Sequence, residues 1–359
     1  MKRIKAMNKT AQNNFLNYIL VTVAFIILQT LMSRGQLSSS LKGQLVPICA
    51  YIVMAVSLNL TVGILGELSL GHAGFMSVGA FTGVIVTMSL KAHIPSLPLR
   101  LAVAMLAGGL VAGLLSLLVG VPVLRLRGDY LAIVTLAFGQ IVKNIIECLY
   151  IGLDQNGLHF SMTNADALGL APGGAALING PMGAVGVTKI STFAMGYALI
   201  IVTLIVVQNL INSRAGRAVM ALRDNRIAAE SLGINITKYK LMAFSTSAVL
   251  AGMAGVLFAM NYSTVVAKKF DFNTSILVLV FVVLGGMGNI RGSIIAAAVL
   301  TVLPELLRSF SDYRMLVYAL VLIAVMLLTH GDKGVRLLGQ LKDRAAAKKS
   351  VGKEGAQHV

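Results

Sequence analysis

The chain has 359 residues, of which 57% are hydrophobic and only 12% are charged. Soluble domains usually carry about a quarter charged residues, whereas apolar runs of about 18 or more residues are typical of transmembrane helices. The composition therefore excludes an ordinary soluble protein and predicts an all-α, polytopic membrane protein. We attribute the formal net charge of +17 to basic residues retained in cytoplasmic loops, so no nucleic-acid partner is expected.

Apolar segments predict about ten transmembrane helices within one domain of residues 15–330. They cover residues 15–32, 45–66, 68–90, 99–124, 130–151, 191–211, 241–262, 274–287, 292–309 and 313–329. The basic residues 1–14 and the first apolar segment imitate a signal peptide, but no clear cleavage motif follows, so an uncleaved first helix is predicted. The segment at 274–287 is short for a full span, which favours a broken or re-entrant helix.

The distribution of Lys and Arg predicts that both termini are cytoplasmic. With the N-terminus inside, 20 of the 30 basic residues fall in inner segments and 9 in outer ones, the bias that cytoplasmic loops show. The polar C-terminal residues 331–359 then form a cytoplasmic tail. Two connections are long enough to have a role of their own, the outer loop 152–190 and the inner loop 212–240.

The inner loop contains the sequence RDNRIAAESLGINITKYK, which predicts a short helix. Asn225 is a good N-cap and Gly233 a good C-terminal stop. One face of this helix is apolar or small: Ile227, Ala228, Ser231 and Leu232. On another face Arg226 and Glu230 are predicted to pair at i,i+4. A two-turn helix is marginal alone, so it needs a supporting surface, either the chain's own helix ends or a groove on a partner.

Polar residues interrupt the segment LGELSLGHAGFMSVGAFTG near an expected helix break. Glu67, Ser69 and His72 lie there, and polar groups at membrane depth usually face a bundle interior or a water-filled path. These residues are too few to predict a metal site. Farther along, Gly79 and Gly83 have the GxxxG spacing that lets helices approach closely.

A second polar group lies on the predicted helix at 130–151. Gln140, Lys143, Asn144 and Glu147 fall at i, i+3, i+4 and i+7, which places them on one helical face. Lys143 and Glu147 are spaced to neutralise each other. This stripe is expected to face protein or water, either along a transport path or against a second subunit.

The chain shows no nucleotide-binding loop of the GxxxxGK[ST] type and no convincing nucleophile–base pair. It is therefore not expected to be an enzyme or to hold a cofactor. The glycines in LGGMGNIRGSIIAA, residues 284–297, indicate a close-packed turn.

Several of these segments together resemble the permease subunits of branched-chain amino acid ABC importers, of the LivM type. LSLGHAGF, LRGDYLAIVTLAFGQI and GGMGNIRG are similar to the family's hallmark segments in the same order. AGRAVMALRDNRIAAESLGINITKYKLMAFSTSAVLAGMAGVLFA is similar to its cytoplasmic loop and following span. The resemblance covers residues 45–328 and implies a location in the bacterial inner membrane.

The resemblance also implies roles for partners and residues. Two cytoplasmic ATP-binding subunits would hydrolyse ATP, and a homologous LivH-type permease would complete the pore. A periplasmic substrate-binding protein would deliver leucine, isoleucine or valine to the outer loop 152–190. The helix that docks on the ATPase would be formed by Asn225, Arg226, Ile227, Ala228, Ala229, Glu230, Ser231, Leu232 and Gly233. The candidates for the translocation path are Glu67, Ser69, His72, Gln140, Lys143, Asn144 and Glu147.

This sequence departs from the family pattern at a few positions. Glu67 stands where Gln is expected and Gln140 where Glu is expected, and the outer loop reads LDQNGL in place of a glycine-rich segment. Two alternatives therefore stay open: the permease of a urea or short-amide ABC importer, and a stand-alone secondary transporter. For the latter, the Lys143–Glu147 pair is the candidate proton relay.

Overall fold

The computed structural model describes residues 9–36, 38–91, 93–126, 128–155, 157–172, 174–307, 319–320 and 323. The chain divides into two compact units, residues 1–302 and 303–359. The described residues of the second unit are 303–307, 319–320 and 323, and the predicted tail at 331–359 lies outside the described residues. The architecture given below is that of the first unit.

Seven helices in the described part of the chain are long and apolar enough to cross a membrane. They are α1 (Lys9–Ser33), α2 (Ser39–Asn59) with its π-helical continuation η2 (Leu60–Leu65), α3 (His72–Ser89), α4 (Leu97–Val123), α5 (Asp129–Glu147), α6 (Phe193–Asn212) and α9 (Ile236–Ala259). They correspond to the first seven predicted segments. The helical membrane class is thereby confirmed.

The next two predicted segments are also helical but shorter. Helix α10 (Phe272–Gly285) has 14 residues and α11 (Ile290–Leu306) has 17. At 1.5 Å per residue, α10 is about 21 Å long, less than the roughly 30 Å of a hydrocarbon core. The tenth predicted segment, residues 313–329, lies largely outside the described residues, so ten spans remain a prediction.

The third predicted span begins later than expected. Helix α3 begins at His72, and the segment between η2 and α3 is not helical. Side chains of other helices accept hydrogen bonds from the backbone at its end: the Leu70 N–H donates to Thr135 Oγ1 (3.1 Å) and the Ala73 N–H to Ser275 Oγ (3.1 Å). These side chains satisfy the backbone groups that a helix would otherwise pair, so the break at residues 66–71 is stable within the bundle.

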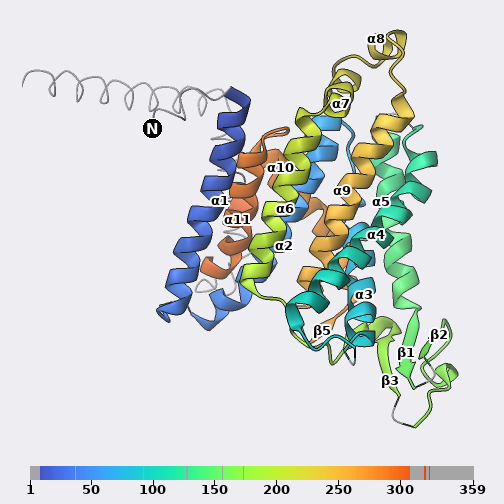
Figure 1. Ribbon diagram of the computed structural model, residues 1–359. Coiled ribbons are helices and arrows are strands. Elements are labelled where there is room, and N and C mark those ends of the chain that lie inside the picture. The colour runs from blue at the N-terminus through green and yellow to red at the C-terminus, as the bar shows by residue number, and fades with distance from the viewer. Residues whose placement is uncertain are drawn as a thin grey trace, which may run out of the picture. The chain divides into compact units, whose positions relative to one another are not determined.

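Helices α2, α3 and α9 form the interior of the bundle and are the most buried of the seven. Small residues bring them together: a Cβ on Gly79 would clash with the backbone of Gly252 on α9, and one on Gly83 would lie 2.6 Å from Val256 Cγ1. The packing role predicted for Gly79 and Gly83 is therefore confirmed. Figure 1 shows α9 within this group of helices.

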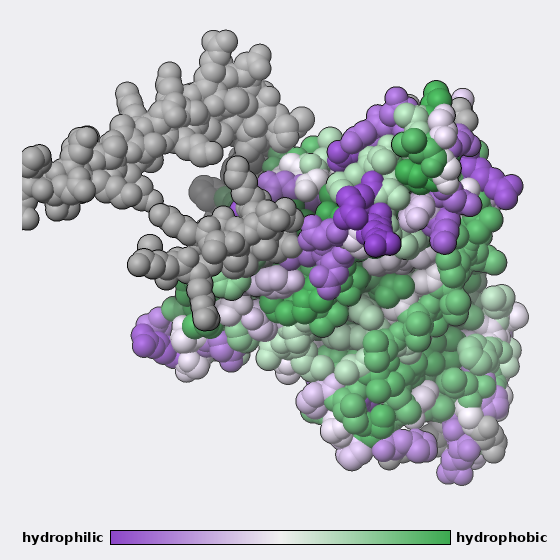
Figure 2. Space-filling model, turned by 45° about the horizontal axis from the view of Figure 1, so that its top comes forward, coloured by the Kyte–Doolittle hydropathy of each residue, from purple (hydrophilic) through white to green (hydrophobic). Residues whose placement is uncertain are grey.

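The outer surface of the bundle is apolar, as lipid contact requires. Leu106, Leu110, Leu114 and Leu118 repeat every four residues along α4 and are all exposed. In Figure 2, hydrophobic side chains cover much of the middle of the visible face and hydrophilic ones gather toward its upper edge.

The prediction of an all-α fold is wrong in the loop 152–190. Strands β1 (Tyr150–Asp154), β2 (Gly157–Ser161) and β3 (Ala175–Asn179) form an antiparallel sheet in the order β2-β1-β3. Two further strands, β4 (Ala184–Val185) and β5 (Thr264–Val265), pair antiparallel and tie the loop to the segment between α9 and α10. Three short 3-10 helices complete these connections: η3 (Asp166–Leu168), η4 (Gly180–Met182) and η5 (Ala267–Phe270). Turns at glycines with positive φ, among them Gly157 and Gly183, favour strands over a continuing helix.

Candidate functional site

The loop 212–240 folds into two short helices, α7 (Arg214–Asp224) and α8 (Arg226–Ser231). Each has its own N-cap. Ser213 Oγ accepts from the Gly216 N–H (3.1 Å) and Asn225 Oδ1 from the Ala228 N–H (3.0 Å). The predicted cap at Asn225 is confirmed, whereas α7 was not predicted.

Helix α8 ends at Ser231, and Gly233 two residues later stops it, as the sequence predicts. Gly233 has φ +80°, and its N–H donates to the Glu230 carbonyl (2.9 Å) while the Ile234 N–H donates to the Ala229 carbonyl (3.1 Å). This is a Schellman motif, in which a left-handed glycine lets two chain N–H groups satisfy the last carbonyls of the helix. Caps at both ends thus fix a helix of fewer than two turns.

Helix α8 presents apolar side chains to solvent. Ile227 is 78% exposed and Leu232, directly after the helix, is 81% exposed, whereas Ala229 is buried. The predicted ion pair of Arg226 with Glu230 is wrong: the described residues contain no such pair, and Arg226 lines a pocket with Glu67 and Lys240 instead. An exposed i,i+4 pair contributes only about 0.3–0.5 kcal/mol, too little to hold Arg226 away from that pocket.

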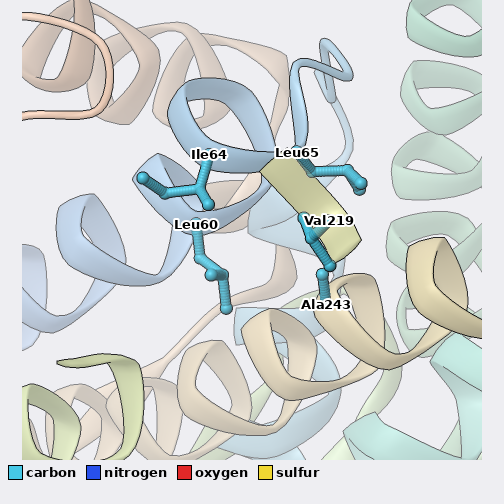
Figure 3. Close-up of a cluster of buried hydrophobic side chains, with 5 residues drawn as sticks. All are labelled: Leu60, Ile64, Leu65, Val219 and Ala243. Atoms are coloured by element: carbon cyan, nitrogen blue, oxygen red, sulfur yellow. The ribbon is translucent and has the colours of Figure 1, made fainter. Parts of the chain in front are cut away.

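Helix α7 is anchored on the inner helices by a cluster of buried side chains. The cluster consists of Leu60, Ile64, Leu65, Val219 and Ala243, which come from η2, α7 and α9 (Figure 3). Partly buried residues of α6, α7 and α9 pack against it: Leu210, Ile211, Met220, Tyr239 and Met242. The end of η2, just before the non-helical break, thus packs directly against the loop that contains α8. We call this contact the η2–α7 junction.

Two charged contacts reinforce the η2–α7 junction. Arg223 Nη1 donates to the carbonyl oxygen of Gly63 (2.9 Å), which places a cation at the C-terminal end of a helix, where the helix dipole favours it. Its side chain passes over Gly66, where a Cβ would lie 2.6 Å from Arg223 Cγ. Glu67 forms an ion pair with Lys240 near the start of α9, and their side chains are only 15% and 6% exposed.

The other two polar residues of the segment around the break, Ser69 and His72, are buried. Ser57 Oγ donates to the Met54 carbonyl (2.9 Å) and lies 2.8 Å from Nε2 of the buried His72. Because the hydroxyl has one proton, His72 Nε2 must be the donor in this contact. Ser69 Oγ is buried without a hydrogen-bond partner among the described residues. A buried hydroxyl of this kind calls for a functional or water-mediated explanation.

Asn59 is a site residue that the sequence analysis missed. Its Nδ2 donates to Ser293 Oγ (2.9 Å) and its Oδ1 accepts from the Gly288 N–H (2.7 Å). The residue therefore ties the end of α2 to the turn between α10 and α11. The sequence could have indicated Asn59, because a polar amide within an apolar segment usually faces the bundle interior.

The polar stripe of α5 lies apart from these groups. Lys143 Nζ lies 3.7 Å from Glu147 Oε1, which confirms the predicted pair, and both are partly exposed. Gln140 is half-buried and Asn144 exposed, next to the exposed Ile141. No hydrogen bond joins the stripe to Glu67, Ser69 or His72 in the described part of the chain, so the structure does not gather all seven path candidates at one point.

The described residues contain no group of three or more His, Cys, Asp or Glu side chains that could hold a metal ion.

Residues 40–328 match a family model described as branched-chain amino acid transport system / permease component. The chain belongs to this family. Within the family, the chain is 37% identical over 292 residues to the LivM proteins of Salmonella typhimurium and Escherichia coli, both described as high-affinity branched-chain amino acid transport system permease proteins. The matched part covers 77% of this chain and 66% of those proteins, so it spans just under two thirds of their length.

Two more distant relatives are also described as branched-chain amino acid transport permeases. A probable LivM protein of Methanocaldococcus jannaschii is 22% identical over 272 residues, which cover 67% of this chain and 74% of that protein. The LivH permease of Escherichia coli is 30% identical over 125 residues, 34% of this chain and 40% of the relative. No solved structure matches the chain.

Proposed function

We propose that this chain is a membrane-spanning permease subunit of an ABC importer for branched-chain amino acids in the bacterial inner membrane. Membership of the permease family supports the class. The observation that carries the proposal is α8, a helix capped at both ends whose Ile227 and Leu232 are 78% and 81% exposed. Covering a side chain of this size contributes roughly 1.5–3 kcal/mol, so a partner that buries both gains substantial affinity.

The partner proposed for α8 is a cytoplasmic ATPase, and residues Asn225–Gly233 are its coupling helix. Two such ATP-binding subunits supply the hydrolysis for which this chain has no nucleotide-binding motif. The η2–α7 junction supports this role, because α7 and the segment preceding α3 share a buried cluster. A displacement of α8 is therefore expected to move the break at residues 66–71. This break contains Ser69 and directly precedes His72.

The translocation path is proposed to run past the two polar groups of the chain. The break contributes Glu67, Ser69 and His72, and a few polar side chains in an apolar corridor suit a zwitterion with an apolar side chain. The stripe formed by Gln140, Lys143, Asn144 and Glu147 is only partly buried within this chain. A homologous LivH-type permease that packs against α5 would cover the stripe and complete the pore.

A periplasmic binding protein is proposed to dock on the loop 152–190. With both termini cytoplasmic, the sheet and α8 lie on opposite sides of the membrane, and Figure 1 draws them at opposite ends of the first unit. The edge strand β2 and the residue after it expose apolar side chains there: Leu158, Phe160 and Met162. This surface offers area that a partner can bury.

The test combines co-purification with uptake. The chain is expressed with its partner permease, both ATPases and the binding protein, and uptake of radiolabelled leucine is measured. Ile227→Asp with Leu232→Asp is expected to insert normally but to lose the ATPases and the uptake. Thr237→Asp is the matched control, because it adds a carboxylate to an exposed position of the same loop outside α8. A double variant that retains both properties would refute the coupling role.

The same assay separates the alternatives. Uptake of leucine by the chain without any ATPase would show a stand-alone secondary transporter. If urea or a short amide inhibits the measured uptake at concentrations at which unlabelled leucine, isoleucine and valine do not, the protein belongs to an amide importer. Uptake that depends on ATPases and is competed by the three amino acids is the expected result.

A further inference from the structure

A polar pocket lies beside the η2–α7 junction. Its volume is about 230 Å³. Apart from two glycines, the pocket is lined by Leu65, Glu67, Leu222, Arg223, Arg226 and Lys240. They come from the end of η2 and the break that follows it, from α7 and α8, and from the start of α9.

Among the described side chains that line the pocket, cations outnumber carboxylates. Lys240 is neutralised by Glu67, and Arg223 pairs with Asp224 and donates to the Gly63 carbonyl. Arg226 is half-buried, yet its guanidinium makes no hydrogen bond or ion pair with any residue that the structure describes. A guanidinium in this setting favours a carboxylate, which it can bind through two parallel hydrogen bonds.

The pocket also offers an acceptor and a small apolar surface. Glu67 bonds Lys240 through Oε1, and its second oxygen, Oε2, has no hydrogen-bond partner among the described residues. A carboxylate oxygen of this kind can accept from an ammonium group. Leu65 and Leu222 line the same space. The cation and the free carboxylate oxygen together match the two charges of an α-amino acid zwitterion.

We propose that this pocket binds a branched-chain amino acid on the cytoplasmic side and that its occupancy slows the transporter. The inference rests on the proposed function, since it takes the imported amino acid as the ligand. A bound zwitterion would connect Arg226 of α8 to Glu67 behind η2, and so hold the coupling helix against the break. Accumulated product would in this way oppose further import.

Direct binding tests the pocket. The complex of this chain with its partner permease and ATPases, without the binding protein, is placed in lipid nanodiscs, and binding of radiolabelled leucine is measured. Binding is expected to be saturable and to weaken about tenfold or more in Arg226→Gln, the loss typical of a hydrogen bond to a charged group. Arg217→Gln is the matched control, because Arg217 is exposed on α7 and does not line the pocket.

Two analogues of leucine test the recognition of both charges. 4-Methyl-2-oxopentanoate lacks the ammonium group and isoamylamine lacks the carboxylate, so each is expected to compete about tenfold more weakly than leucine or worse. If the oxo acid or inorganic phosphate competes as well as leucine, the pocket is a general anion site and the proposal is overturned. Equal binding by Arg226→Gln and the wild type overturns it too.

ATP hydrolysis by proteoliposomes tests the regulation. Leucine added on the ATPase side is expected to lower the rate of the wild type and of Arg217→Gln. Arg226→Gln is compared with its own rate without leucine and is expected to be insensitive. An equal fractional inhibition of Arg226→Gln and the control overturns the proposal. Uptake is measured separately: its absence contradicts the proposed function, whereas uptake without cytoplasmic leucine binding contradicts only this inference.

Discussion

Replacing Lys240 by methionine is expected to destabilise the η2–α7 junction strongly. Methionine keeps most of the side-chain volume but leaves the Glu67 carboxylate without its partner. The two side chains are 6% and 15% exposed, and removal of one member of a buried pair typically costs about 3–5 kcal/mol. Because Glu67 keeps some contact with solvent, we expect a value near the lower limit, about 3 kcal/mol. The free energy of unfolding is measured by titration with SDS in mixed micelles.

A double-mutant cycle distinguishes the pair from a general loss of packing. Glu67→Gln combined with Lys240→Met removes both charges, so the double variant is expected to cost at least about 2 kcal/mol less than the sum of the single variants. Lys238→Met, at an exposed position of the same helix, is the control and is expected to stay within about 0.5 kcal/mol of the wild type. Additive single effects would show that the two residues do not interact.

Three further results are expected. Gly233→Ala places a non-glycine residue at positive φ, which is expected to destabilise the C-terminal cap of α8 by about 1–2 kcal/mol. Asn225→Ala removes the N-cap of α8, which is expected to cost about 1 kcal/mol. Both variants are expected to reduce co-purification of the ATPases, and unchanged co-purification would contradict this. Gly79→Ala drives a Cβ into the backbone of Gly252, whereas Gly43→Ala meets open space, so only the first is expected to lower the yield of folded protein, measured by fluorescence-detected size exclusion. Phe160→Ser on β2 is expected to raise the binding-protein concentration needed for half-maximal uptake and to leave ATPase co-purification unchanged. If only the ATPase co-purification changes, β2 lies outside the docking surface.

Local patterns predicted much of this fold. Seven spans follow from runs of apolar residues, because a bilayer leaves a helix little choice of length. The ends of α8 follow from Asn225 and Gly233, since a side-chain cap and a left-handed glycine act on atoms within a few residues. The Lys143–Glu147 pair is equally local, one helical turn apart.

Contacts between distant segments could not be predicted in this way. Glu67 and Lys240 are 173 positions apart, and Asn59 and Gly288 are 229 apart. Periodicity reports which face of one helix is apolar, not which helix packs against it. The sheet in the loop 152–190 was missed for a related reason: its strands pair with one another, and apolar side chains such as Phe160 point to solvent, so the alternation that marks a half-buried strand is weak.

Helix α9 joins the two ends of the first unit. Lys240 near its start belongs to the η2–α7 junction, while just beyond its other end the Met260 carbonyl accepts from the Ile190 N–H (3.1 Å) and β5 pairs with β4. Its 24 residues make a rod of about 36 Å at 1.5 Å per residue. We expect a tilt of this helix at its start, which lies next to α8 in the chain, to move β4 and β5 at its other end. By thermodynamic reciprocity, a partner whose binding moves β4 and β5 would then change the affinity of a partner at α8 by the same factor.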